Sequence, residues 1–165
     1  MEFQQKLLRR REMSGSLHPY SFWEEDGKYI FDTTSGARYV AYFLDLTSFA
    51  DHLFTFNFDR VREKQRKIVD SQVFDTICVI LEGFFTKHRN ALLLVCDSTD
   101  GREAARMRLF NSWFHRISPP GLLKIDRMGF AETYSLLVSF LVWENNPDKD
   151  YLVAKLDEYC STMLE

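Results

Sequence analysis

Hydrophobic and polar positions follow a strand-like period in the first third of the chain. Aromatic and β-branched residues fill 28–44 on both sides of Thr34, Ser35 and Gly36. This pattern predicts a hairpin, because Gly36 can take the positive φ of a tight turn. In 52–59, phenylalanine occupies every second position, which indicates a further strand with one wet face. The sequence therefore predicts that the fold begins with three antiparallel strands.

A helical period follows these strands. Asp70 is a suitable N-cap for a helix that runs to about residue 88. Its apolar positions form one stripe, which predicts that the helix covers a sheet, whereas Asp75, Thr76 and Glu82 lie off the stripe. The stripe consists of Val73, Phe74, Ile77, Leu81, Phe84 and Phe85.

The second half of the chain alternates between strands and helices. A continuous apolar run at 91–96 is typical of a strand buried on both faces, and a helix at about 100–117 follows it. Two strands, 122–127 and 133–143, flank a turn near Gly129, and a last helix begins at Asp148 or Asp150. The order βββ-α-β-α-ββ-α predicts an α+β fold with a mixed, mostly antiparallel sheet and helices packed on it.

Length and composition indicate a folded chain with one domain. The 165 residues are 45% hydrophobic and include 15 Phe, 7 Tyr and 3 Trp, which is enough to bury a core. The first residues are rich in arginine, at Arg9–Arg11, and precede a turn-prone break. We therefore expect a flexible basic arm at 1–17 and a single α+β domain at 18–165.

Charge, cysteine usage and motifs exclude several classes of function. The net charge of −3 gives no general attraction to nucleic acid or to an anionic membrane, and no apolar run is long enough to span a bilayer. Cys78, Cys96 and Cys160 are odd in number and far apart, as in a cytoplasmic protein with reduced, buried thiols. Ligand spacings for a metal and glycine-rich cofactor motifs are absent. We expect no metal, no cofactor and no catalytic residue.

The stretch CDSTDGREAARMRLF contains the most informative charges. Its residues Asp97 to Asp100 are suitable helix caps, and a helical wheel places Arg102 and Arg106 on the inward side of the next helix. An arginine that faces a core needs a partner, and the candidates for Arg106 are Asp97, Asp100 and Asp70. Two interpretations stay open. Arg106 forms an internal ion pair, or Arg102, Arg106, Asp97 and Asp100 form an anion-binding pocket at the end of the strand.

Three antiparallel strands, a helix, a buried strand and another helix are also how a ribonuclease H-like domain begins. Such nucleases hold two metal ions with acidic residues on the first strand, the first helix and the fourth strand. The matching residues here are Asp32, Glu82 or Asp75, and Asp97, with Asp100 beside it. Glu82 and Asp75 lie off the stripe that faces the sheet, and acidic residues at strand ends are commonly caps. A metal-dependent nuclease is therefore an alternative hypothesis.

Three stretches carry a family resemblance: PYSFWEEDGKYIFDTTSGARYVAYF, VFDTICVILEGFF and CDSTDGREAARMRLFNSWF. They resemble a family of small Bacteroidetes proteins of unknown function, closely over 19–114 and loosely over the rest. The resemblance implies a bacterial cytoplasmic origin and supplies no catalytic residue. We expect a non-enzymatic binding or regulatory module that recognises a protein partner, or a second copy, through aromatic surface. A nuclease and an anion or nucleotide pocket at Arg102 and Arg106 are the alternatives.

Overall fold

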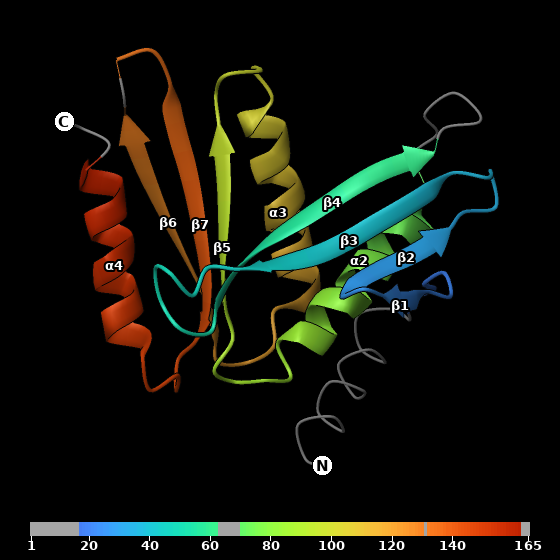
Figure 1. Ribbon diagram of the computed structural model, residues 1–165, viewed down its shortest axis with the longest axis horizontal. Helices are drawn as coiled ribbons and strands as arrows, with labels where there is room; N and C mark the ends of the chain where they lie inside the picture. The colour runs from blue at the N-terminus through green and yellow to red at the C-terminus, as the bar shows by residue number, and fades with distance from the viewer. Residues whose placement is uncertain (1–16, 63–69, 131, 163–165) are drawn as a thin grey trace. The chain divides into compact units, whose positions relative to one another are not determined.

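The computed structural model describes residues 17–62, 70–130 and 132–162 (Figure 1). The predicted arm up to residue 16, with Arg9–Arg11, lies outside the described residues. The predicted α+β class and order of elements are confirmed, with one short strand added in front. The elements are β1 (Trp23–Glu25), β2 (Lys28–Asp32), β3 (Arg38–Asp45), β4 (Leu53–Arg62), α2 (Ser71–Phe84), β5 (Ala91–Asp97), α3 (Glu103–Ile117), β6 (Leu122–Phe130), β7 (Ser135–Trp143) and α4 (Lys149–Thr162).

The strands form a mixed sheet in the order β1-β2-β3-β4-β5-β7-β6. Strands β4 and β5 are parallel, while β5 pairs with β7, and β7 with β6, in antiparallel register. The chain divides into two compact units. Unit 1 contains the described residues up to Tyr42 and those from Phe58 to Gly83, and unit 2 contains Phe43–Asn57 and the described residues from Phe84 onward.

In unit 1, a two-residue turn joins β1 to β2. Asp26 and Gly27 have φ values of 50° and 74°, and Glu25 pairs with Lys28 across the turn. An Asp-Gly pair suits this turn because both central residues need positive φ. The next hairpin turns at Gly36, where φ is 83° as its sequence predicts. The sequence prediction missed the first turn and therefore missed β1.

Stacked rings form the centre of unit 1. Phe31 is fully buried, and its ring lies 5.4 Å from that of Tyr39 and 6.1 Å from that of Tyr20. Tyr39 in turn stacks on Phe58 at 5.1 Å. Tyr39 and Phe58 come from neighbouring strands, where facing side chains lie close enough for rings to pack. This row of rings explains why the aromatic residues of β2, β3 and β4 recur at strand spacing.

Helix α2 is buried on a wider face than its apolar stripe predicts. Thr76, which lies off the stripe, is fully buried. The backbone N–H of Tyr20 donates to Thr76 Oγ1 at 2.9 Å, and that hydroxyl donates to the carbonyl oxygen of Gln72 at 2.6 Å. The segment before β1 therefore packs against this side of the helix. A periodicity argument misses such a contact because the burying segment has no period of its own.

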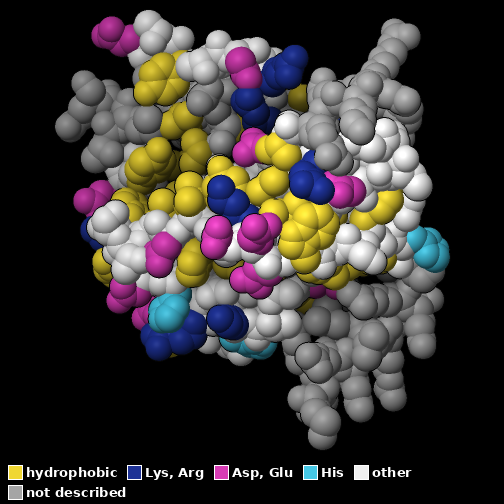
Figure 2. All heavy atoms as spheres, turned by 45° about the vertical axis from the view of Figure 1, so that its right-hand side comes forward, with side chains coloured by type: hydrophobic (Ala, Val, Ile, Leu, Met, Phe, Trp, Pro, Cys, Tyr) yellow, Lys and Arg dark blue, Asp and Glu magenta, His cyan; other side chains and the backbone are white. Residues whose placement is uncertain are grey.

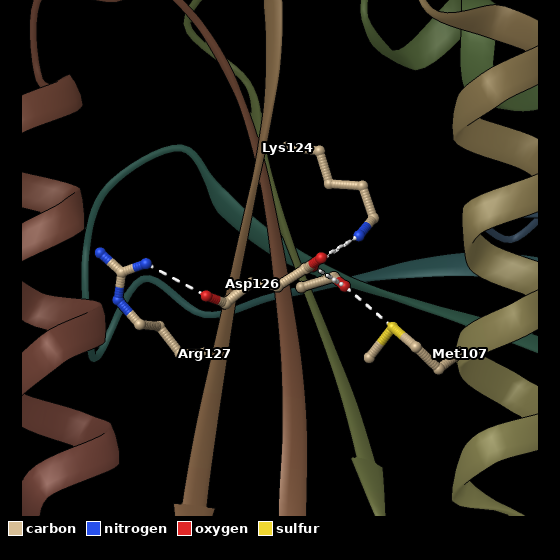
Figure 3. A network of polar contacts seen from close by, with 5 residues as sticks. Met107, Lys124, Asp126 and Arg127 are labelled. Atoms are coloured by element: carbon tan, nitrogen blue, oxygen red, sulfur yellow. Dashed lines mark hydrogen bonds and ion pairs between the residues drawn. The ribbon is translucent and has the colours of Figure 1, made fainter.

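In unit 2, β5, β7 and β6 lie between α3 and α4 (Figures 1 and 3). Alternation along β6 points Asp126 toward α3 and Arg127 toward α4, where Arg127 pairs with Asp157 at 2.7 Å. The α4 side of the sheet carries the core of this unit. Its buried members are Ala50, Leu53, Ala91, Leu93, Leu136, Val138, Phe140, Val142, Leu152, Leu156 and Cys160.

Two local predictions need correction in unit 2. Val95 keeps 38% of its surface exposed, although its apolar run predicts burial on both faces. The reason is that β4 pairs with β5 only over Ala91–Leu93. Gly129 lies inside β6 and pairs with Leu136, so it is not the predicted turn residue.

The predictions about the cysteines, membrane-spanning segments and surface charge apply to both units. Cys78, Cys96 and Cys160 are buried, as their contexts predict, and form no disulfide within the described residues. Within the described residues, no helix has the length and apolarity needed to cross a membrane. On the face shown in Figure 2, basic and acidic side chains lie next to one another, in keeping with the small net charge.

Candidate functional site

Arg106 forms the ion pair predicted for it, but at the surface. Its Nη1 donates to Asp100 Oδ1 at 3.0 Å, and its Nη2 bonds to Asp100 Oδ2. The two side chains are 40% and 43% exposed, so the prediction of a buried arginine is wrong. Helical side chains lean toward the N-terminus of their helix, and this carries Arg106 to the turn that precedes α3. Arg102 is exposed, and the side chain of Asp97 lies outside the described part.

The acidic stretch before α3 forms a turn, whereas its sequence predicts a helix cap. The N-cap is Arg102, which makes no side-chain cap bond. Asp100 Oδ1 accepts the backbone N–H of Arg102 at 3.0 Å, and Ser98 Oγ accepts that of Ser135 at 2.8 Å. Asp100 therefore stabilises the bend between β5 and α3, and Ser98 ties it to the start of β7.

Arg106→Gln tests whether this ion pair is structural. Hydrogen bonds from two residues lower the pKa of Asp100 below its ordinary value. The larger effect comes from the Arg106 side chain and the smaller from the backbone N–H of Arg102. A depressed carboxyl pKa contributes stability above the ordinary pKa, and this is lost as pH falls through the folded-state pKa. We expect Arg106→Gln to raise the pKa of Asp100 in a carboxyl NMR titration. Because the pair is exposed, the melting temperature at neutral pH should change by less than about 3 °C.

A large fall in melting temperature would show that the pair pins α3 in place. The wild type and the variant should also become more alike as pH falls through the carboxyl range, because Asp100 is then neutral in both. Arg108→Gln, on an exposed position of the same helix, is the matched control.

Two carboxylates of the nuclease hypothesis, those of Asp32 and Asp75, accept hydrogen bonds within unit 1. Asp32 accepts two hydrogen bonds from Arg38, at 2.7 and 2.8 Å, beside the turn that follows β2. Asp75 accepts the backbone N–H of His18 at 2.9 Å. Across the described ranges, no group of three or more His, Cys, Asp or Glu side chains is placed to hold a metal ion.

Unit 2 contains a pocket of about 520 Å³, which we call the α4 pocket. Three separate segments build it: the loop before β4, the loop between α2 and β5, and the first turn of α4. None of its residues was predicted as a site from the sequence. The lining residues are Thr47, Phe49, Ala50, Asp51, His52, Arg89, Asp148, Tyr151 and Leu152.

One buried amide holds two sides of the α4 pocket together. Asn146 is only 5% exposed, and its Nδ2 donates to the carbonyl oxygen of Arg89 at 3.1 Å. Its Oδ1 accepts the backbone N–H of Asp148 at 2.9 Å. The side chains of Arg89 and Asp148 then form an ion pair at 3.0 Å. Asn146 thus sets the position of both charged residues.

Trp143 anchors the loop that carries Arg89. Its Nε1 donates to the carbonyl oxygen of Phe85 at 3.0 Å, and its ring stacks on His88 at 4.4 Å. Asn90 closes the other end of the loop, since its Nδ2 donates to the carbonyl oxygen of Phe84 at 2.9 Å. The loop is therefore fixed by buried polar contacts rather than by regular secondary structure.

His52 adopts a left-handed backbone conformation at the edge of the α4 pocket. Its φ is 57°, a value that is uncommon outside glycine but enriched for His, Asn and Asp. The backbone N–H of Ala91 donates to the carbonyl oxygen of His52 at 2.9 Å, which holds this conformation in place. Such residues cluster at functional sites, although they also occur in tight turns such as the one at Asp26.

The α4 pocket combines charges of both signs with an apolar wall. Arg89 supplies a guanidinium, His52 an imidazole, and Asp51 and Asp148 supply carboxylates. The wall comes from aromatic and aliphatic side chains, those of Phe49, Ala50, Tyr151 and Leu152. A site of this composition can orient a small polar molecule through several hydrogen bonds at once.

Comparison with known proteins identifies one family. A family model described as a family of unknown function, DUF6169, matches residues 69–158. No curated protein and no solved structure matches the chain. The matched span includes Arg89, Asp148 and Tyr151, whereas Asp51 and His52 lie before it.

Proposed function

The chain belongs to DUF6169, a family of unknown function, and we propose that it is a non-enzymatic binding module that holds a small polar molecule in the α4 pocket. The observation that carries this proposal is the convergence of Arg89, Asp148 and the strained His52 on one cavity, although they come from distant segments. Buried contacts from Asn146 and Trp143 support these segments. Pre-organisation of this kind lowers the entropic cost of binding.

The pocket lining indicates the chemical class of the ligand. Arg89 is 58% exposed and can offer its guanidinium to a carboxylate or phosphate group. Asp51 and Asp148 can accept hydrogen bonds from hydroxyl or ammonium groups of the same molecule. The volume of about 520 Å³ falls in the range of small-molecule sites. We therefore propose an anionic ligand that also carries hydroxyl or amino groups. The sequence resemblance supports a bacterial cytoplasm as its setting.

Arg89→Gln tests this proposal. We would screen amino acids, hydroxy acids, sugar phosphates and nucleotides for an increase in melting temperature, and then measure affinities by calorimetry. Arg89→Gln should weaken binding of any hit at least about tenfold, because a charge-assisted hydrogen bond is lost. The variant should stay folded, since its ion pair with Asp148 is exposed.

Arg108→Gln, at an exposed position of α3, is the matched control and should bind as the wild type does. A screen without any stabilising compound would count against the proposal. A hit that Arg89→Gln and Arg108→Gln bind equally well would place the ligand elsewhere.

The start of α3 is a second candidate site for an anion. Arg106 and the backbone of Arg102 converge there on Asp100, so an anion would have to displace this carboxylate. A hit that is lost in Arg106→Gln but kept in Arg89→Gln would favour this site. The nuclease alternative has its own test, which is Mg²⁺- or Mn²⁺-dependent cleavage of RNA or DNA that Asp97→Asn abolishes.

A further inference from the structure

Strand β6 forms one end of the sheet and has an open edge. In the part of the chain that the structure describes, it pairs with β7 along its whole length and with no strand on its other side. Asp126, Met128 and Phe130 remain more than half exposed, at 56% for the Asp126 side chain, 55% and 54%. A long edge strand with exposed apolar side chains is a template for pairing with another strand.

The hydrogen-bonding pattern shows which backbone groups face this edge. The N–H of Glu144 donates to the carbonyl oxygen of Gly121 at 2.7 Å, so the odd-numbered residues of β6 point their backbone groups toward β7. The even-numbered residues then point theirs outward. The carbonyl oxygen of Asp126 agrees with this pattern, since the side chain of Arg127 reaches it at 3.1 Å. Lys124, Asp126 and Met128 therefore present backbone donors and acceptors at the edge.

Hydrogen bonds to each other and to β7 hold the charged side chains of this edge in place. Lys124 Nζ lies 2.5 Å from both carboxylate oxygens of Asp126 (Figure 3). The hydroxyl of the fully buried Ser139 donates to Asp126 Oδ1 at 2.6 Å and contacts the sulfur of Met107 at 3.2 Å. Although Asp126 is exposed, Lys124 is only 11% exposed. Lys124 and Asp126, two residues apart, therefore hold a positive group that is mostly buried and a negative group that is exposed, and the two are paired within the chain.

This spacing selects one register for pairing of β6 with a second β6. A two-fold axis perpendicular to the sheet relates two antiparallel strands and leaves each face of the sheet on the same side. One residue then lies at the axis and pairs with its own copy in the other chain. An axis at Lys124 or at Asp126 places like charges opposite each other, and an axis at Arg127 does the same for that residue. An axis at Ile125 places Lys124 of each chain opposite Asp126 of the other, which is favourable.

We propose that two copies of this chain associate through antiparallel pairing of β6 with β6 about a two-fold axis at Ile125. Lys124 and Asp126 then exchange backbone hydrogen bonds across the interface, because both point outward. Leu122 lies opposite the exposed Met128, which extends the contact with apolar surface. The partner is a second copy because β6, when it runs antiparallel to itself, supplies the complementary order of Lys124 and Asp126. The proposal is independent of the α4 pocket.

Charge exchange tests the register directly. Light scattering of the wild type should give about 39 kDa, which is two chains of 19.5 kDa. Lys124→Asp and Asp126→Lys each place like charges opposite each other twice in a dimer, so each should raise the dissociation constant at least about tenfold. A mixture of the two variants should restore the dimer as a heterodimer, since each acidic residue of one chain then faces a lysine of the other.

A cysteine at the axis supplies a second test that leaves these charges in place. Residues at the axis form a non-hydrogen-bonded pair, with Cα atoms about 4.5 Å apart, which a disulfide can bridge. Ile125→Cys should therefore crosslink under mild oxidation, whereas Leu123→Cys, which faces Arg127, should not. A wild type that stays monomeric at its highest soluble concentration would overturn the proposal. So would folded charge variants whose mixture stays monomeric, or crosslinking at position 123 and not at 125.

Discussion

Replacing Trp143 by alanine is expected to lower the free energy of unfolding by about 3–5 kcal/mol. The side chain is only 2% exposed, so its removal leaves a large cavity in unit 2. The same change removes the hydrogen bond to the carbonyl oxygen of Phe85 and the stacking partner of His88. Urea titration followed by circular dichroism measures the effect. Since the loop that carries Arg89 loses its anchor, ligand binding in the α4 pocket should fall as well.

Trp143→Phe separates the two contributions of this side chain. It keeps most of the buried volume but removes the Nε1 donor, so the carbonyl oxygen of Phe85 loses its hydrogen bond. The expected loss is about 1–3 kcal/mol, the cost of an unsatisfied buried polar group. A Trp143→Ala variant that unfolds within about 1 kcal/mol of the wild type would show that Trp143 does not support the loop.

Replacing Phe31 by alanine should destabilise unit 1 by about 3–5 kcal/mol. Phe31 is fully buried and lies in the row of rings between Tyr20 and Tyr39. Alanine leaves a cavity that rigid aromatic neighbours fill poorly, and it removes two ring contacts. The same urea titration measures this loss.

Phe22→Ala is the matched control for this prediction. Phe22 precedes β1, is 36% exposed and makes an edge contact with the Tyr29 ring at 5.9 Å. Its replacement should change the free energy of unfolding by less than about 1 kcal/mol. Equal losses at Phe22 and Phe31 would contradict a central role for the row of rings.

Contacts between distant segments explain where sequence prediction fell short in the fold. The period of two in β4 and the stripe of α2 were readable because each repeats along one element. Thr76 and Val95 were assigned wrongly, because their burial depends on a neighbouring segment and on how far a neighbouring strand extends. The turn at Asp26 and Gly27 differs from these cases, because an Asp-Gly pair is itself a local signal for a tight turn.

The candidate sites also differ in whether neighbouring residues or distant segments form them. The pair of Arg106 with Asp100 was among those predicted, because the two residues are six positions apart at a helix start. The α4 pocket had no local signal, since His52, Arg89 and Asp148 are separated by dozens of residues. Asn146 is a polar residue before a helix, which by itself indicates only a cap or a turn. Its hydrogen bond to the carbonyl oxygen of Arg89 is visible only in the tertiary structure.

For this chain, the α+β class, the order along the chain of the elements from β2 onward and the burial of the three thiols were determined by sequence alone. These properties follow from short-range periodicity and composition, which every folded conformation must respect. Tertiary structure decided the exposure of Arg106, the α4 pocket and the open edge at β6. Each of these depends on which distant segments meet. Contacts between distant segments leave no pattern in any single stretch of the sequence.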